Sequence, residues 1–157
     1  MLDLPANVKP SLLDRLVDVS VLGPTSPQWY TPAQMIDAVR RDLESLLNTR
    51  RTNQQLCDGL AEVENSLITY GVPDASSLQV ITNAQRNQVV RTIEETIERF
   101  EPRLSRVRVE LVGPTPRKDR VLRLKVTGRL NVDPAVDVGF DGSLELTTGQ
   151  ISMTAQA

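Results

Sequence analysis

The spacing of apolar residues changes once along this 157-residue chain. Up to Phe100 the apolar positions recur every three or four residues, which is the period of one face of an α-helix. From Leu104 onward they alternate with polar residues, which is typical of strands that bury one face. This order predicts an α+β domain, in which N-terminal helices cover one face of an antiparallel β meander.

Two long helices are predicted in the first part of the chain. Thr31 is placed to cap the first helix, Pro32 takes its first position, and Gln34 can complete a capping box. The second long helix starts at Thr82 or Asn83. The first helix has an apolar stripe of Met35, Val39, Leu43, Leu46 and Leu47. The second is predicted to bury Val89, Val90, Ile93, Ile97 and Phe100, with Glu94, Glu95 and Glu98 facing away.

Two shorter helices complete the helical part. One lies between the long helices and is predicted to end at Gly71. Its apolar residues are Leu60, Val63, Leu67 and Ile68. The other is a short amphipathic helix over residues 11–17, followed by a turn-rich stretch. We therefore divide the chain into an N-terminal arm, residues 1–30, and a main domain, residues 31–157. We expect the arm to pack on its own domain; the alternative is that it docks on another subunit.

The strands carry one apolar face and one polar face. The apolar positions are Val107, Val109, Leu111, Leu122, Leu124, Val126, Leu130, Val132, Val136, Val138, Phe140, Leu144, Leu146, Ile151 and Met153. The basic residues of the polar face are Arg106, Arg108, Arg123, Lys125 and Arg129. Because this face lacks interleaved aromatic residues for base stacking, we expect it to be solvated or to meet an acidic protein rather than nucleic acid.

The absence of histidine narrows the chemistry that the chain can perform. Catalytic triads and histidine-zinc sites are excluded, because histidine is the commonest general base and transition-metal ligand. Cys57 is the only cysteine, which excludes an intrachain disulfide and favours a reducing compartment. A formal net charge of -2 gives no general attraction to nucleic acid or to anionic membranes. With no apolar run near the ~20 residues of a membrane span, we expect a cytoplasmic protein without metal, cofactor or direct membrane insertion.

Paired carboxylates are the remaining basis for catalysis. Glu101 with Asp137 or Asp141 would form the acid and nucleophile of a glycosidase, such as a peptidoglycan hydrolase. The acid of such a pair needs an apolar pocket that raises its pKa, whereas Arg103 beside Glu101 would lower it. Residues 137–142 also lack the spacing of a calcium loop. We therefore expect a protein that is not an enzyme.

The segment Glu101-Pro102-Arg103-Leu104 lies where the last helix must end and the first strand begins. The carboxylate of Glu101 faces the negative end of the helix dipole, which costs about 0.3–1 kcal/mol, and Pro102 disfavours helical geometry at Glu101. Two interpretations are open. In the first, Glu101 and Arg103 pair with each other on the surface, with a gain of about 0–1 kcal/mol. In the second, the corner is a docking site, where a partner satisfies the charge.

Four segments in a fixed order carry a family resemblance. They are SLLDRL at 11–16, DLESLLNTRR at 42–51, SLITYGVPD at 66–74 and FEPRL at 100–104, with Phe140 and Thr148-Gly149 further on. Together they resemble the TssE family of type VI secretion baseplate subunits, which is related to the phage tail baseplate wedge proteins once labelled lysozyme-like. The last segment contains the family's Glu-Pro-Arg motif. Two departures are Thr69, where asparagine is common, and Gly142, which leaves the strand boundaries after Phe140 open.

The resemblance implies a structural subunit of a contractile, phage-like injection machine, in the cytoplasm at a baseplate docked on the inner membrane. It implies binding to the TssF and TssG baseplate subunits. The partner-binding residues are then Glu101, Pro102, Arg103 and Leu104, with a second contact at Arg50 and Arg51. It also implies a fold similar to the handshake domain of sheath subunits, so that TssB and TssC can join by strand exchange at a free sheet edge. The alternative is the equivalent subunit of a phage or phage-derived tail.

Overall fold

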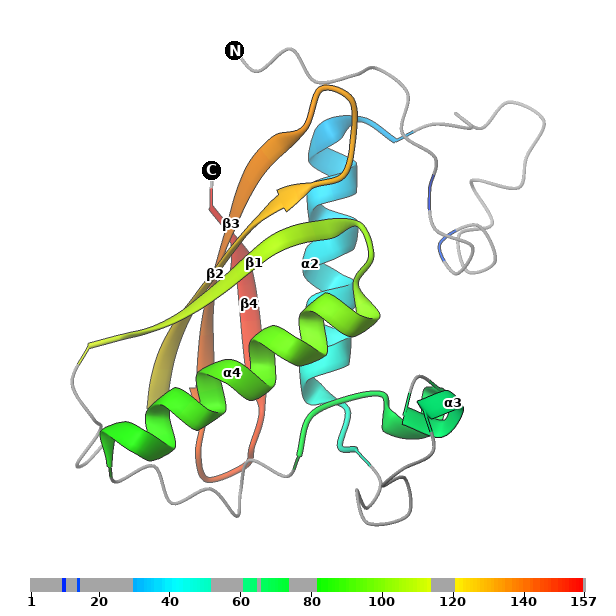
Figure 1. The fold of residues 1–157 in the computed structure, drawn as a ribbon. Helices are drawn as coiled ribbons and strands as arrows, with labels where there is room; N and C mark the ends of the chain where they lie inside the picture. The colour runs from blue at the N-terminus through cyan, green and yellow to red at the C-terminus, as the bar shows by residue number, and fades with distance from the viewer. Residues whose placement is uncertain are drawn as a thin grey trace.

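The computed structural model describes residues 10, 14, 30–51, 61–64, 66–73, 82–113 and 121–156. Its helices are α2 (Pro32–Asn48), α3 (Ala61–Glu64), the short 3-10 helix η3 (Leu67–Thr69) and α4 (Asn83–Phe100). Its strands are β1 (Leu104–Val112), β2 (Val121–Leu130), β3 (Val136–Glu145) and β4 (Ile151–Ala155). The strands form one antiparallel sheet in the order β1-β2-β3-β4, with α2 and α4 on one side of it (Figure 1). The predicted α+β class with a meander is confirmed.

Both long helices begin at capping boxes. The Gln34 amide N–H donates to Thr31 Oγ1 at 3.3 Å, and the Thr31 amide donates to Gln34 Oε1 at 2.8 Å. Thr82 and Gln85 repeat this arrangement at the start of α4. The predicted starts of both helices are confirmed, because each box satisfies amide groups that have no partner inside the helix.

The core lies between the two long helices and one face of the sheet. Phe140 of β3 is fully buried at its centre. Val90 and Phe100 of α4 are only partly buried at its rim. The other buried apolar residues on the long helices and the strands are Met35, Ala38, Val39, Leu43, Leu46, Leu47, Val89, Ile93, Ile97, Leu104, Val107, Val109, Leu122, Leu124, Val126, Leu130, Val136, Val138, Leu144, Ile151 and Met153. The predicted core faces of α2 and of the strands are therefore largely confirmed.

A β-bulge interrupts the alternation of β1. Residues 106–107 together lie opposite Gly128 of β2, and Arg106 has a left-handed backbone with φ 52°. The extra residue allows Leu104 and Val107 to face the core together, although they are three positions apart. The bulge therefore shifts, by one residue, which side chains of β1 point to the core.

Gly142 does not end the strand in which it lies. β3 continues through it to Glu145, and Gly142 stands between Leu124 and Met153 in the register of the sheet. A Cβ atom at this position would lie 2.6 Å from Met153 Sδ and 2.9 Å from Leu124 Cδ1. The glycine therefore makes room for two core side chains, and the strand boundary that the sequence left open is settled.

The prediction of one helix that carries Leu67 and Ile68 and ends at Gly71 is wrong, because both residues lie in the separate turn η3. Their exposed fractions are 84% and 52%. The Ile68 amide donates to Ser66 Oγ at 3.3 Å, so Ser66 starts the new 3-10 turn and the helical period does not continue from α3. Within this turn only Thr69 is buried.

The N-terminal arm is described at few positions. The predicted helix over 11–17 lies outside the described residues except at Asp14, whose carboxylate accepts a hydrogen bond from Arg41 of α2 at 3.1 Å. Asp14 thus lies against its own domain. Within the described ranges, no helix has the length and apolar character needed to cross a bilayer.

Candidate functional site

The corner between α4 and β1 begins with Glu101 as the C-cap of α4. Its amide donates to Ile97 O at 2.8 Å, and its backbone has left the helical region, with φ -119° and ψ 78°. Pro102 explains this change, because the proline ring crowds the helical conformation of the residue before it. The Leu104 amide then donates to Glu101 O at 3.1 Å, and Leu104 enters the sheet opposite Leu130.

Glu101 and Arg103 form a buried pair within the chain. Arg103 Nε donates to Glu101 Oε1 at 2.6 Å, and Nη2 donates to Oε2, so the guanidinium holds both carboxylate oxygens. The Arg103 amide also donates to Oε1 at 3.2 Å. The Glu101 side chain is 5% exposed, so this is not the surface pair of the first interpretation. The expectation that Glu101 is satisfied only by a partner is also wrong, because the fold itself supplies the counter-charge.

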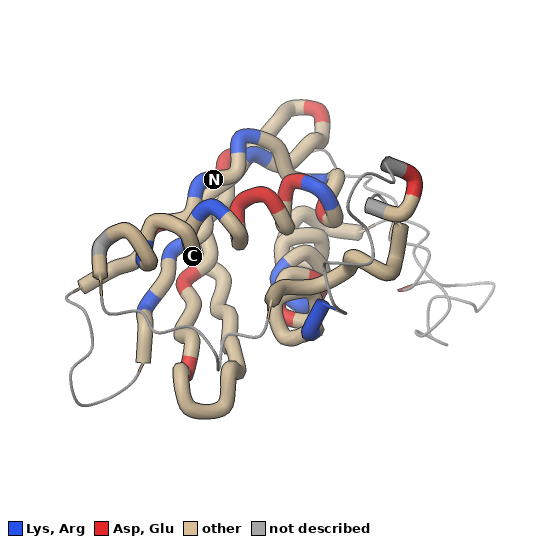
Figure 2. Tube along the Cα trace, turned by 60° about the horizontal axis from the view of Figure 1, so that its bottom comes forward, with Lys and Arg blue, Asp and Glu red and all other residues tan. Residues whose placement is uncertain are grey.

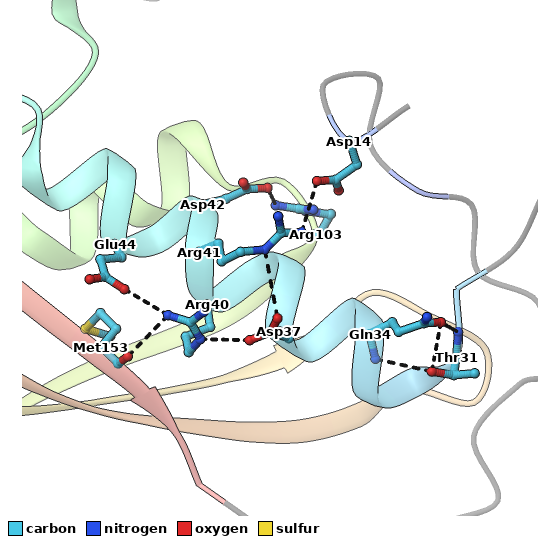
Figure 3. A network of polar contacts seen from close by, with 10 residues as sticks. All are labelled: Asp14, Thr31, Gln34, Asp37, Arg40, Arg41, Asp42, Glu44, Arg103 and Met153. Atoms are coloured by element: carbon cyan, nitrogen blue, oxygen red, sulfur yellow. Dashed lines mark hydrogen bonds and ion pairs between the residues drawn. The ribbon is translucent and has the colours of Figure 1, made fainter. Parts of the chain in front are cut away.

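Asp42 of α2 is the third member of this cluster (Figure 3). Its Oδ2 accepts a hydrogen bond from Arg103 Nη2, which joins residues 61 positions apart in the sequence. Burial lowers the pKa of Arg103, but the hydrogen bonds and charges of Glu101 and Asp42 outweigh it and raise the pKa above its ordinary value. Arg103 therefore stays charged, and one guanidinium ties α2 to the end of α4. Arg103 Nη1 is buried and has no hydrogen-bond partner among the described residues.

Tyr70 and Phe100 line the same corner. Their rings meet edge to face, with centroids 5.2 Å apart and planes at 70°. Burial raises the pKa of the Tyr70 hydroxyl, the charges of Asp42 and Glu101 raise it further, and a hydrogen bond with Ser45 opposes them. Sequence reasoning missed Asp42 and Tyr70 as members of the cluster, although both lie in segments that carry the family resemblance.

The predicted partner-binding residues differ in their exposure. Pro102 is exposed and Arg103 is partly exposed. Glu101 and Leu104 are buried, with exposed fractions of 4% and 5%. Asn131 fastens the corner from the other side, because its Nδ2 donates to Pro102 O at 2.9 Å and its amide donates to Arg103 O at 2.8 Å. The corner is therefore a fixed surface that presents Pro102 and one side of Arg103.

Arg50 and Arg51 follow α2 and pair with the segment at Gly71. The Arg51 amide donates to Val72 O at 2.8 Å, and Arg51 Nη2 donates to Thr96 Oγ1 of α4 at 3.4 Å. Gly71 has φ 100°, and a Cβ there would lie 2.2 Å from a backbone oxygen of Thr49. Arg51 thus helps to hold the fold, whereas Arg50 is exposed.

The edge of the sheet at β1 is covered by side chains of α4. Val109 N donates to Glu94 Oε1 at 2.8 Å, and Arg86 Nη2 donates to Gly113 O at 3.0 Å. The prediction that Glu94 faces away is therefore wrong, because its carboxylate takes the place of a neighbouring strand. Such cover protects an edge strand from pairing with another chain.

The edge at β4 is covered only at its start. Asn48, the last residue of α2, donates to Ile151 O at 2.7 Å and accepts from Ile151 N at 2.8 Å, as a neighbouring strand would. Arg40 of α2 reaches Met153 O at 3.4 Å (Figure 3). Among the described residues, no hydrogen bond reaches Ala155 on the side away from β3.

Among the described residues, the predicted carboxylates do not form a catalytic pair. Glu101 is buried and holds Arg103 with both oxygens, while Asp137 and Asp141 are exposed on β3. Among the described residues there is also no group of three or more histidine, cysteine, aspartate or glutamate side chains placed to hold a metal ion.

Two long helices on one face of a four-stranded meander, with a buried ion-paired corner, define a small α+β domain. The profile of the family described as baseplate wedge protein gp25 matches residues 33–135, and the chain belongs to this family. Its name describes a structural component of a baseplate rather than an enzyme. The matched residues include both long helices' core faces and the whole corner.

A solved structure shows the same fold. It is a chain from a structure titled "The baseplate complex from the type VI secretion system", with a TM-score of 0.50 and 20% sequence identity. The match covers 79% of the present chain and 92% of that chain. A search of curated proteins gave no significant match.

The buried pair yields a first prediction. Arg103→Met leaves the Glu101 carboxylate buried without its counter-charge, and we expect the free energy of unfolding to fall by about 3 kcal/mol or more. Glu101→Gln in the same chain removes that charge, so the double variant should lose less than the sum of the two single variants. Urea unfolding of all four proteins measures the coupling, and strictly additive losses would contradict the pair.

The hydroxyl of Tyr70 yields a second prediction. Because folding raises its pKa, its contribution to stability is complete below the ordinary value of 10.0 and is lost as the pH rises through the folded-state pKa. The unfolding free energy of the wild-type protein should therefore decline above about pH 10.0, and we expect Tyr70→Phe to make this decline less steep. Tyr30→Phe is the comparison, because burial and Asp14 also raise the pKa of Tyr30. The same alkaline decline in wild type and in Tyr70→Phe would refute the assignment.

Proposed function

We propose that this chain is a structural subunit of a baseplate wedge in a type VI secretion system, equivalent to TssE. The observation that carries the proposal is the family match over residues 33–135, which contains the ion-paired corner. The shared fold with a chain of a type VI secretion baseplate structure supports the same role. In this role the protein works in the cytoplasm, as a part of the assembly docked on the inner membrane, and performs no catalysis.

The corner is the contact for the TssF and TssG subunits. Glu101 and Asp42 hold the guanidinium of Arg103 in one orientation, so binding costs little side-chain entropy. The part of Arg103 that stays exposed, 24% of its side chain, is then open to a carbonyl or carboxylate oxygen of a partner helix. Pro102, exposed beside it, adds an apolar contact of fixed shape. Arg50, exposed after α2, provides the second contact, with Arg51 as its support.

Sheath subunits join at the end of β4. Main-chain hydrogen bonds to an exposed edge give affinity for an added strand. The edge of β1 is occupied by Glu94 and Arg86, whereas that of β4 has no hydrogen bond at Ala155 from the described residues. An added strand of TssB or TssC would therefore begin beyond Asn48, at the C-terminal part of β4.

Substitution of Arg103 tests the wedge contact. Arg103→Lys keeps the positive charge but loses the planar fork and the Nη1 donor. We expect recovery with TssF and TssG in co-purification to fall by at least about tenfold, which corresponds to about 1.4 kcal/mol. Far-UV circular dichroism and a cooperative melt of the isolated variant will show that the domain still folds.

Arg40→Lys is the matched control for this experiment, because Arg40 also forms ion pairs with two carboxylates, those of Asp37 and Glu44. It should leave recovery unchanged. Normal recovery of a folded Arg103→Lys protein would remove the corner from the interface. Recovery with phage tail wedge proteins in place of TssF and TssG would favour the phage-tail equivalent.

Ala155→Pro tests the edge of β4. The amide of Ala155 points away from β3, so proline removes an outward donor while the ladder to β3 remains. We expect baseplates that contain this variant to assemble but to start few sheaths, as counted by electron microscopy. Thr154→Ala on the same strand should behave as wild type. Normal sheath numbers with Ala155→Pro would exclude this edge.

A further inference from the structure

The face of the sheet opposite the helices carries a shallow depression near the bulge. Arg106, Thr127, Arg129, Gly139 and Gln156 are among the residues that line it. The Gln156 side chain lies over Gly139, where a Cβ would be only 2.5 Å from Gln156 Oε1. Most charged residues along β1 and β2 are basic, while those along β3 are acidic (Figure 2).

Arg106 is held in a conformation that arginine rarely adopts. Its φ of 52° is left-handed, a region that glycine enters without strain and most other residues do not. The core requires an extra residue at this position, because the bulge turns both Leu104 and Val107 inward. It does not require an arginine, whose side chain is exposed and makes no ion pair within the described residues. Strained residues that the fold does not need are frequent at binding sites.

Arg129 brings a second guanidinium to the depression. Its Nε is buried and makes no hydrogen bond with the described residues, and it lies 3.9 Å from Asp137 Oδ1. That distance is too long for a hydrogen bond, and the Asp137 side chain is 89% exposed. The Arg129 side chain is nevertheless 41% exposed, so the rest of its guanidinium is open to an acceptor from outside the chain.

We propose that this depression binds a carboxylate, namely an aspartate or glutamate side chain of a protein partner. Two guanidinium groups from adjacent strands offer the forked donors that match a carboxylate. With Arg106, Arg129 and Asp137 the local charge is +1, which suits one carboxylate better than a doubly charged phosphate. The inference does not depend on the wedge assignment, because it uses the opposite face of the sheet.

Nuclear magnetic resonance of the full chain tests the proposal directly. The Nε–H signal of Arg129 should shift and saturate when the protein is titrated with a short peptide that contains two glutamates. The same peptide with glutamines should leave the signal in place. Inorganic phosphate at equal ionic strength should move it less. No shift with the glutamate peptide, or an equal shift with phosphate, would overturn the proposal.

Variants separate binding from structure. Arg106→Gly should weaken peptide binding by at least about fivefold, since it removes one of two charge-assisted donors. Its melting temperature should be unchanged or up to about 4 °C higher, because glycine adopts this backbone without strain. A purely structural Arg106 would leave the affinity as in wild type, and that result would refute its role.

Two further variants complete the test. Asp137→Asn removes the internal carboxylate that competes for Arg129, so the peptide should bind more tightly; unchanged or weaker binding would count against the site. Arg123→Ala removes the same charge from an exposed position of β2, opposite Ser143. It should change the affinity by less than about twofold, because only long-range attraction is lost. A loss equal to that of Arg106→Gly would show general charge attraction instead of a site.

Discussion

The guanidinium of Arg103 joins the end of α4 directly to α2. It receives one carboxylate from the C-cap of α4 and another from the middle of α2, 61 residues earlier in the sequence. A buried charge is tolerated only when its partners are in place, so these contacts form together or not at all. Because β1 starts directly after this group, the contacts of Arg103 fix the point at which the first strand leaves α4.

Local sequence patterns were sufficient for much of the fold. Thr31 and Thr82 mark the helix starts through capping boxes, and strict alternation identifies the strands. The same patterns located the corner but not its third partner, because helical periodicity does not show which polar residue of α2 lies opposite a distant turn. Leu67 was misassigned because Ser66 starts a new turn that the apolar spacing does not reveal. The bulge had no signal either, since an arginine stands where glycine would have indicated one.

Side chains of the helices make hydrogen bonds to the sheet edges that a neighbouring strand would otherwise make. An amide side chain at the end of α2 offers one donor and one acceptor to a single residue of β4, and a carboxylate of α4 accepts from an amide of β1. A sheet can in this way remain open at part of one edge without exposing all of its backbone to unwanted pairing. These polar helix residues were the hardest to assign from sequence, because a polar side chain at a helix surface usually indicates contact with water.

The bulge in β1 also determines which face of the sheet the side chains between the corner and the bulge point to. With side chains alternating along a strand, removal of one residue at 106 would reverse the facing of everything between the bulge and the corner. Leu104 would then point to the outer face, and the guanidinium of Arg103 would turn away from α2. Within this family, length changes at this point should therefore be much rarer than changes of residue type. The extra residue of the bulge, Arg106, is a spacer: its presence keeps helix and strand in register, whatever its side chain.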